Sequence, residues 1–345
     1  LDLEFSLSGN WLVKTDLYDK LKVVVGGLVA TKYASESVSN YMSYGPYKLT
    51  KYEYGKSIYM EKNEKWYGYH DGKHENQFQM DAIKTTVITD HNTVRQEFEK
   101  GNLDDFSMNK TDMKTYGNSS RKTTTYESYT QKISFNSNRS KLLSRQSGSD
   151  NKTVLANDAF RKGLSLSLDR NNFASQTTAG SKGFTGLLND LYLVDAEKGT
   201  MYRSTEQAKG VYQQVYGELG GDPYADGYEV KALDEKSNGY NFQMATKYVA
   251  QGIKEELQST ESGHLTNGNN IKLEFRVYDT ESETTQDMLT FIRGAFTKVL
   301  EAAKAKLADE GINANDVSIE IRAEKDENYY DTAKNGGYDM IFSTW

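Results

Sequence analysis

The sequence predicts an α/β protein, and the clearest evidence is the order of patterns in its second half. Apolar residues keep the spacing of a helix over 242–257 and the alternation of a strand over 271–277. Helical spacing returns over about 282–309, and strand alternation returns over 317–321. A strand, a long helix and another strand are typical of a βαβ unit with parallel strands. We therefore expect 271–277 and 317–323 to pair in one sheet, with the helix packed on it.

The first half begins with a hairpin pattern over residues 43–66. Gly45-Pro46 marks a turn, and alternating residues follow it as in a half-buried strand. Gly55-Lys56 is expected at the hairpin tip, before a second alternating stretch. A further strand is predicted over 84–90, and a short helix that ends at a glycine is predicted over 91–101.

The middle of the chain is less regular. Residues 129–138 read as a strand, and 139–157, rich in Ser, Asn and Lys, read as a loop. Residues 157–170 keep helical spacing behind an Asn or Asp that can cap the helix. The segment 171–239 is weakly patterned and is predicted to be rich in loops.

Both ends of the chain carry strand patterns, over 1–8 and 338–345. The start lacks the basic and then apolar layout of a signal peptide. A chain that starts and ends in strands is expected to be a fragment of a longer protein.

The composition describes a polar globular chain, with 37% hydrophobic and 26% charged residues. No apolar run approaches the roughly 20 residues that cross a bilayer. The longest run, around Leu21–Ala30, is broken by Gly26-Gly27 and is read as core. A formal net charge of -7 without a basic cluster argues against nucleic acid or an anionic membrane as a partner.

Motifs for cofactors and catalysis fail on their spacing. Gly55-Lys56-Ser57 is no phosphate-binding loop, because Thr50 stands where another Gly is required. Residues 222–227 begin like a calcium loop, but Leu233 replaces the required Glu, so they read as a turn. There is no Cys, and the four His form neither a metal-ligand pattern nor a Ser-His-Asp arrangement. We expect no metal, no cofactor and no catalytic residue.

Five segments carry more specific landmarks. In the hairpin these are Gly45-Pro46-Tyr47, Gly55, Lys62-Asn63 and Trp66. The others are FEKGNLDDF at 98–106, ISFNSN at 133–138, NDAFRKGLSLSLDR at 157–170 and NGGYDMIFSTW at 335–345. Together and in this order they resemble the solute-binding proteins of peptide-type ABC transporters, the oligopeptide- and dipeptide-binding group. The chain departs from the family at Glu64, where Pro is usual, and over 67–80 and 171–240.

The resemblance implies a two-lobed α/β fold of the periplasmic-binding-protein type (type II, oligopeptide-binding group). Two lobes joined by hinge strands would close on a ligand. Residues 1–132 are expected to form part of the large lobe, 133–138 an inter-lobe hinge strand and 139–345 the second α/β lobe. By the same resemblance the large lobe is incomplete, because an N-terminal part and a C-terminal return are missing.

The implied function is the capture of extracellular oligopeptides in the inter-lobe cleft and their delivery to ABC permease subunits, without enzymatic activity. We expect a monomer outside the cytoplasm, either a cell-surface lipoprotein of a Gram-positive organism or a periplasmic protein. One alternative is the same scaffold with an oligosaccharide or another small solute, which the aromatic content also suits. A peptidase is a more distant alternative.

The predicted site centres on the last residue, Trp345. Ligand crevices in open α/β sheets form at the carboxyl ends of strands. The resemblance adds that the matching Trp usually stacks against ligand, while the alternative is a core residue or a frayed terminus. Abundant Tyr, 25 in all, suits a recognition cleft. The ligand-binding residues that we expect are Trp345, Thr344, Tyr329, Tyr129, Phe135 and Asn136.

Overall fold

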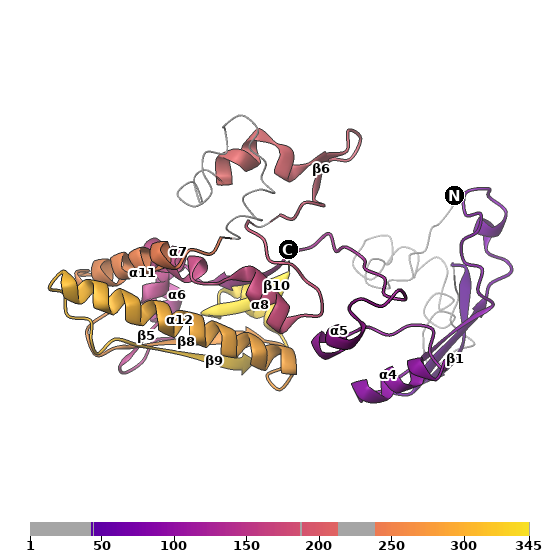
Figure 1. Ribbon diagram of the computed structural model, residues 1–345, viewed down its shortest axis with the longest axis horizontal. Coiled ribbons are helices and arrows are strands. Elements are labelled where there is room, and N and C mark those ends of the chain that lie inside the picture. Colours follow the sequence, from indigo (N-terminus) through magenta and orange to yellow (C-terminus); the bar gives the residue numbers. More distant parts are fainter. Residues whose placement is uncertain (1–42, 44, 187, 213–238, 345) are drawn as a thin grey trace, which may run out of the picture. The chain divides into compact units, whose positions relative to one another are not determined.

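The computed structural model describes residues 43, 45–186, 188–212 and 239–344. Contacts divide the chain into two units, Leu1–Ser107 and Met108–Trp345 (Figure 1). The strand expected over 1–8, the core run near Leu21–Ala30 and the turn at 222–227 lie outside the described residues. The predicted lobe boundaries at 132 and 139 stay a prediction.

The described part of the first unit is built on a three-stranded antiparallel sheet. Its strands, in spatial order, are β1 (Tyr47–Glu53), β2 (Ser57–Lys62) and β3 (Ala82–Thr86). Gly55, with φ of +68°, makes the turn that the hairpin pattern predicted. The strand expected over 84–90 begins and ends earlier, at Ala82 and Thr86, and Asp90 accepts a hydrogen bond from Thr93 N–H and caps helix α4 (His91–Glu99).

Hydrogen bonds from Asn63 explain the spacing of the hairpin landmarks. The Asn63 side-chain amide donates to the Gly45 carbonyl (3.0 Å), and its backbone N–H donates to the Pro46 carbonyl (2.7 Å). The Tyr69 hydroxyl donates to the same Pro46 carbonyl (2.9 Å). Trp66 is buried and packs against the Tyr69 ring in an edge-to-face arrangement, with 5.0 Å between the two ring centroids. The two strands of the hairpin therefore bring Asn63 and Trp66 close to the Gly45-Pro46 turn.

The second unit contains a five-stranded mixed sheet. Its strands are β4 (Gln131–Phe135), β5 (Asp150–Asn151), β8 (Asn270–Val277), β9 (Ser318–Lys325) and β10 (Met340–Thr344). Strands β5, β9 and β10 pair with β8 in parallel, and β4 pairs with β10 antiparallel. The parallel pairing of β8 with β9 confirms the predicted βαβ unit. A separate small ladder joins β6 (Leu193–Asp195) to β7 (Thr200–Met201).

The second unit also contains seven named helices within its described residues. They are α5 (Lys110–Tyr116), α6 (Arg139–Leu143), α7 (Asp158–Leu166), α8 (Arg170–Thr177), α11 (Phe242–Leu257), α12 (Glu283–Asp309) and α13 (Tyr329–Asn335). The loop prediction for 139–157 is wrong, because this segment holds α6, β5 and a 3-10 turn at Thr153–Ala156. These elements are too short to show a period, but they bury Leu142, Val154 and Leu155 completely. The helix predicted over 157–170 ends at Leu166, and Asp169 caps α8.

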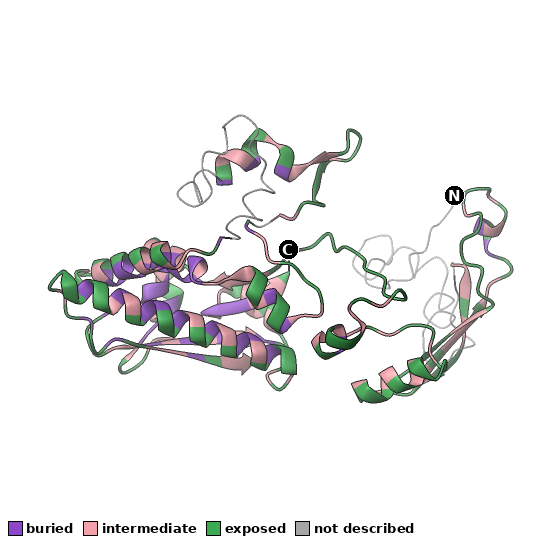
Figure 2. Cartoon of the chain, in the orientation of Figure 1, coloured by how far each residue is buried: buried purple, intermediate pink, exposed green. Residues whose placement is uncertain are grey.

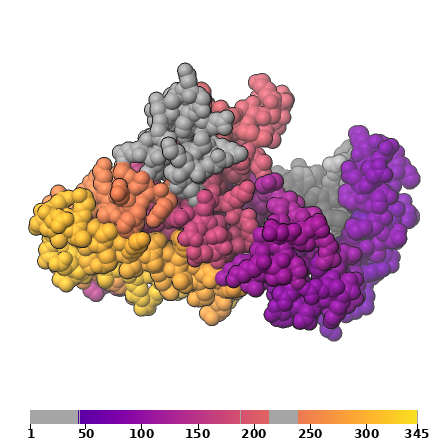
Figure 3. Space-filling model, in the orientation of Figure 1, coloured from indigo at the N-terminus to yellow at the C-terminus, as the bar shows by residue number. Residues whose placement is uncertain are grey.

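The core lies between the sheet and the helices. The odd residues of β8 (Ile271, Leu273, Phe275 and Val277) are buried, while its even residues are only partly buried. The long helix α12 lies along the sheet, and the buried residues of the second unit gather where helices and sheet meet (Figures 1 and 2). In the space-filling view, residues from α11 to β9, orange to yellow, form one continuous mass (Figure 3). The alternation in β8 thus gives an apolar face toward the helices and a polar opposite face.

Two glycines of this unit predict opposite effects of the same substitution. An alanine Cβ at Gly252, in α11, would lie 2.6 Å from Phe160 N in α7, whereas nothing lies within 4 Å of a Cβ at Gly294 in α12. We expect Gly252→Ala to lower the free energy of unfolding by about 1–3 kcal/mol through overpacking. Gly294→Ala should raise it by up to about 1 kcal/mol, since alanine favours an exposed helix position. Urea unfolding of both variants tests the helix contact, and equal effects would contradict it.

Candidate functional site

The carboxyl edge of the second unit's sheet is set by the register of its parallel strands. Val277 at the end of β8 pairs with Lys325 at the end of β9, and Asp326 N–H donates to the Val277 carbonyl (2.9 Å). Met340 of β10 pairs with Phe275, so β10 runs in the same direction toward Thr344. Ligands of open α/β sheets bind outside such an edge.

Exposed tyrosines stand at this edge. Tyr278 directly follows β8 and is 68% exposed, and Tyr330 in the first turn of α13 is 74% exposed. The neighbouring Tyr329 is half-buried, with its ring 4.5 Å from that of Tyr330 between centroids. Burial, and then its contact with Tyr330, raises the pKa of Tyr329. The sequence patterns did not single out Tyr278 or Tyr330 as candidate site residues, although Tyr278 directly follows a predicted strand.

Two further predicted site residues lie at this edge. Thr344 is exposed and pairs with Gln131 of β4. Tyr129 lies two residues before Gln131 and is 42% exposed. The Asn189 side-chain amide donates to the carbonyls of Glu127 and Tyr129, at 3.1 Å each, and fixes this backbone. Together with Tyr329, these residues form the part of the predicted site that the structure brings to one edge.

Phe135 and Asn136 lie at the other end of the β4–β10 ladder. Phe135 pairs with Met340, four residues or about 13 Å along the strand from Thr344. It packs against the core, with its ring centroid 6.3 Å from that of Phe296. The structure does not bring these two residues together with Thr344, Tyr129 and Tyr329.

The side chain of Asn136 is occupied by the backbone around it. Its amide donates to the carbonyls of Gly336 (3.0 Å) and Tyr338 (2.8 Å), its side-chain oxygen accepts from Asn138 N–H (2.9 Å), and its own N–H donates to the Asp339 carbonyl (2.9 Å). Asn136 thereby closes the loop before β10. A ligand contact of this residue, or of Phe135, stays a prediction, and Trp345 lies outside the described residues.

A buried ion pair holds β10 beside β8. Lys152 is 3% exposed and donates its ammonium to the carboxylate of Asp339, which is fully buried. Lys152 also donates to the Lys272 carbonyl (2.9 Å), and Asp339 accepts from Glu274 N–H (2.8 Å). Asp339, the residue before β10, is thus bonded both to β8 and to Lys152 in the segment that follows β5.

Glu274 extends this network on the polar face of the sheet. Arg145 and Arg276 both donate to its carboxylate, the latter at 2.8 Å. Burial alone would raise the pKa of Glu274, but the charges of Lys152, Arg145 and Arg276 outweigh it and hold the pKa below its usual range. Glu274 is therefore a carboxylate that stabilises the fold in its ionised form.

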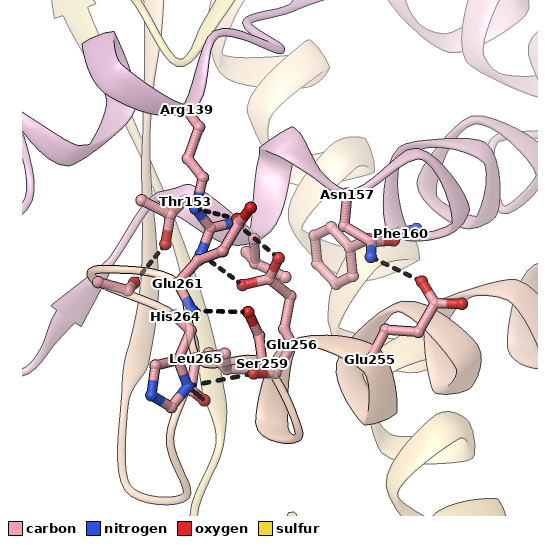
Figure 4. A network of polar contacts seen from close by, with 12 residues as sticks. Arg139, Thr153, Asn157, Phe160, Glu255, Glu256, Ser259, Glu261, His264 and Leu265 are labelled. Carbon is pink, nitrogen blue, oxygen red and sulfur yellow. Dashed lines mark hydrogen bonds and ion pairs between the residues drawn. The ribbon is translucent and has the colours of Figure 1, made fainter.

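A polar pocket of about 620 Å³ lies at the opposite edge of the sheet, between α6, α7 and α11. Arg139 lies between two carboxylates there, with nitrogen-oxygen distances of 2.8 Å to Glu256 and 2.8 Å to Glu261 (Figure 4). The Asn157 amide donates to Glu255 (2.8 Å) while its oxygen caps α7. These ion pairs and hydrogen bonds join α6, α7 and α11, so the pocket is a structural junction between helices.

Neither a metal centre nor a membrane helix emerges from the described residues. Across them, no three or more His, Cys, Asp or Glu side chains gather in a group that could hold a metal ion. No helix in this part of the chain combines the length and apolar character needed to cross a bilayer.

Comparisons with known proteins place the fold. The family model of bacterial extracellular solute-binding proteins, family 5 (middle), matches residues 20–345. No sequence among the curated proteins matches the chain. Among solved structures it is similar to OppA of Listeria monocytogenes bound to peptide, at 19% identity and a TM-score of 0.56, over 95% of this chain and 50% of that one. AppA from Clostridium difficile is similar at 16% identity and a TM-score of 0.52, over 90% and 49%.

These likenesses confirm the α/β fold of the oligopeptide-binding group that the sequence motifs predicted. An oligopeptide ABC transporter substrate-binding domain from Bacillus anthracis gives the same picture, at 15% identity and a TM-score of 0.50, over 87% and 45%. The chain thus spans about half the length of the solved structures that it matches.

The lowered pKa of Glu274 predicts an acid-dependent loss of stability. Its contribution is complete above the unfolded pKa, about 4.3, and is lost as the pH falls through the lower folded pKa. Glu274→Gln should therefore unfold at lower urea than the parent at pH 7, and the difference should close as the pH falls below the unfolded pKa and through the lower folded pKa, where Glu274 becomes protonated. Circular dichroism during urea unfolding measures it. A difference that does not change with pH would contradict the assignment.

Proposed function

Because the chain belongs to the bacterial extracellular solute-binding proteins of family 5, we propose that it captures oligopeptides outside the cytoplasm for an ABC importer. The observation that carries this proposal is the family match, which runs from residue 20 to residue 345. The fold shared with OppA, whose solved structure is bound to peptide, supports it. In this proposal the chain binds its solute without catalysing a reaction.

The carboxyl edge is the proposed binding surface. Exposed Tyr278 and Tyr330 offer large, stiff ring faces that accept many side chains, as capture of varied peptides requires. Thr344 adds an exposed hydroxyl at the end of β10. Tyr129 and Tyr329 lie at the same edge, and Trp345 would extend the surface by one residue. Phe135 and Asn136 support the position of β10 from its other end.

The remaining assignments follow from the same premise. Segment 133–138 serves as the inter-lobe hinge, between a large lobe over 1–132 and a second lobe over 139–345. The partners are the peptide and the permease subunits in the membrane, and the protein acts as a monomer. It works at the cell surface as a lipoprotein or in the periplasm.

Thermal-shift measurements separate this function from its alternatives. A ligand at about a hundred times its Kd stabilises a protein by about 2.7 kcal/mol. We expect mixed peptides to raise the Tm of the full-length protein and cello-oligosaccharides to leave it unchanged. Tyr278→Ala should remove most of the peptide effect, because it deletes an exposed ring of the proposed surface.

Tyr54→Ala is the matched control, since Tyr54 is 90% exposed at the hairpin tip of the first unit. Stabilisation by oligosaccharides alone would overturn the peptide proposal in favour of a sugar-binding protein. Cleavage of the peptides, abolished by one side-chain substitution, would favour a peptidase.

A further inference from the structure

The segment that leads into β4 is held by a single side chain. Residues 121–129 are all exposed. Within the described residues, the only hydrogen bonds that join 123–129 to another part of the chain end on the carbonyls of Glu127 and Tyr129. Both are donated by the side-chain amide of Asn189, at 3.1 Å each. Asn189 therefore holds the backbone that carries Tyr129, one of the residues of the proposed binding surface.

The Asn189 amide is itself held in one orientation. Its side-chain oxygen accepts from Leu191 N–H (2.9 Å), so its nitrogen, with two hydrogens, faces the two carbonyls. The backbone carbonyl of Asn189 accepts from Tyr192 N–H (3.3 Å) in the turn before β6. The side chain therefore has donors for two acceptors and is directed at both of them.

A buried arginine anchors the backbone next to Asn189. Arg203 is 7% exposed, and its guanidinium carbon lies 5.2 Å from the ring centroid of Phe184 and 5.0 Å from that of Tyr212. It donates to the carbonyl of Leu188, the residue before Asn189, at 3.2 Å. The exposed segment is thus attached to a packed support.

We propose that Asn189 is a positioning residue for peptide capture, because it holds Tyr129 in place at the carboxyl edge. The inference rests on the proposed function, since it concerns the same surface. Tyr129 is 42% exposed, and Gln131, two residues later, pairs with Thr344 at the end of β10. Without the two hydrogen bonds, residues 127–129 would have to become ordered when the peptide binds, and this cost would lower the affinity.

Titration of the full-length protein with mixed peptides, followed by the Tm, tests this role. We expect Asn189→Asp to need about tenfold more peptide than the parent for the same rise in Tm. A carboxylate at this position still accepts from Leu191 N–H but cannot donate to the two carbonyls. Each rise is measured from the ligand-free Tm of the same variant. A purely structural role would change that starting value and leave the peptide concentration unchanged.

A double variant tests whether Asn189 acts through Tyr129. Tyr129→Ala should also weaken the peptide effect. Addition of Asn189→Asp to it should cause no further loss, because the ring that Asn189 positions is already absent. Asn189→Ala removes the donors without adding a charge, so it should act in the same direction as Asn189→Asp.

Asn269→Asp is the matched control. The Asn269 amide donates to the Ser149 carbonyl (3.1 Å), and its oxygen accepts from Thr266 N–H (2.8 Å). The substitution therefore removes the same kind of hydrogen bond directly before β8, at the opposite edge of the sheet, and the peptide titration should match that of the parent.

Three results would overturn this inference and leave peptide capture intact. They are a parental titration in both Asn189 variants, an equal loss in Asn269→Asp, and additive losses in the double variant. A parent protein whose Tm does not rise with the mixed peptides would overturn the proposed function and this inference with it.

Discussion

The buried ion pair between Lys152 and Asp339 is the interaction on which the second unit's geometry depends most. A buried charge without a partner is strongly destabilising, so the two side chains must meet for either to be tolerated. Asp339 directly precedes β10 and also accepts from Glu274 N–H of β8. The pair therefore sets where β10 begins along β8. Because each strand residue adds a nearly fixed rise, the pair also sets where β10 ends, at Thr344.

The polar contacts at the end of the sheet where β10 starts thus fix the position of the carboxyl edge at the other end. Asn136 and the Lys152–Asp339 pair occupy the end where β10 starts, with their polar groups directed to backbone and to each other. The apolar face of β8 is covered by helices. Exposed side chains of the carboxyl edge, Tyr278 and Tyr330 among them, are not needed for these contacts. That division leaves these side chains exposed at the edge that we propose as the binding surface.

The sequence predicted those parts of this arrangement that repeat regularly. Strands β8 and β9 and helix α12 are long enough to show their period, and their parallel pairing followed from the βαβ rule. The short elements within 139–157 show no period. Burial of Lys152 could not be predicted either, because its partner lies 187 residues away in the sequence. The family resemblance predicted a ligand contact for Asn136, whereas in the structure its side chain donates to backbone carbonyls. The exposed position of Tyr278 at the carboxyl edge could have been predicted, because this residue directly follows a predicted strand.

Hydrogen exchange of the β10 amides in a Lys152→Met variant tests the dependence most directly. Methionine fills a similar volume without charge and removes the ammonium of Lys152 from the buried Asp339 carboxylate, which keeps only the more distant Arg145 Nε at 3.4 Å as a cationic neighbour. The account predicts much faster exchange over Met340–Thr344 in the variant, and unchanged exchange over the hairpin Tyr47–Lys62 of the first unit, which serves as the internal control. Protection of β10 equal to that of the parent chain would contradict the claim that this ion pair positions the strand and the edge beyond it.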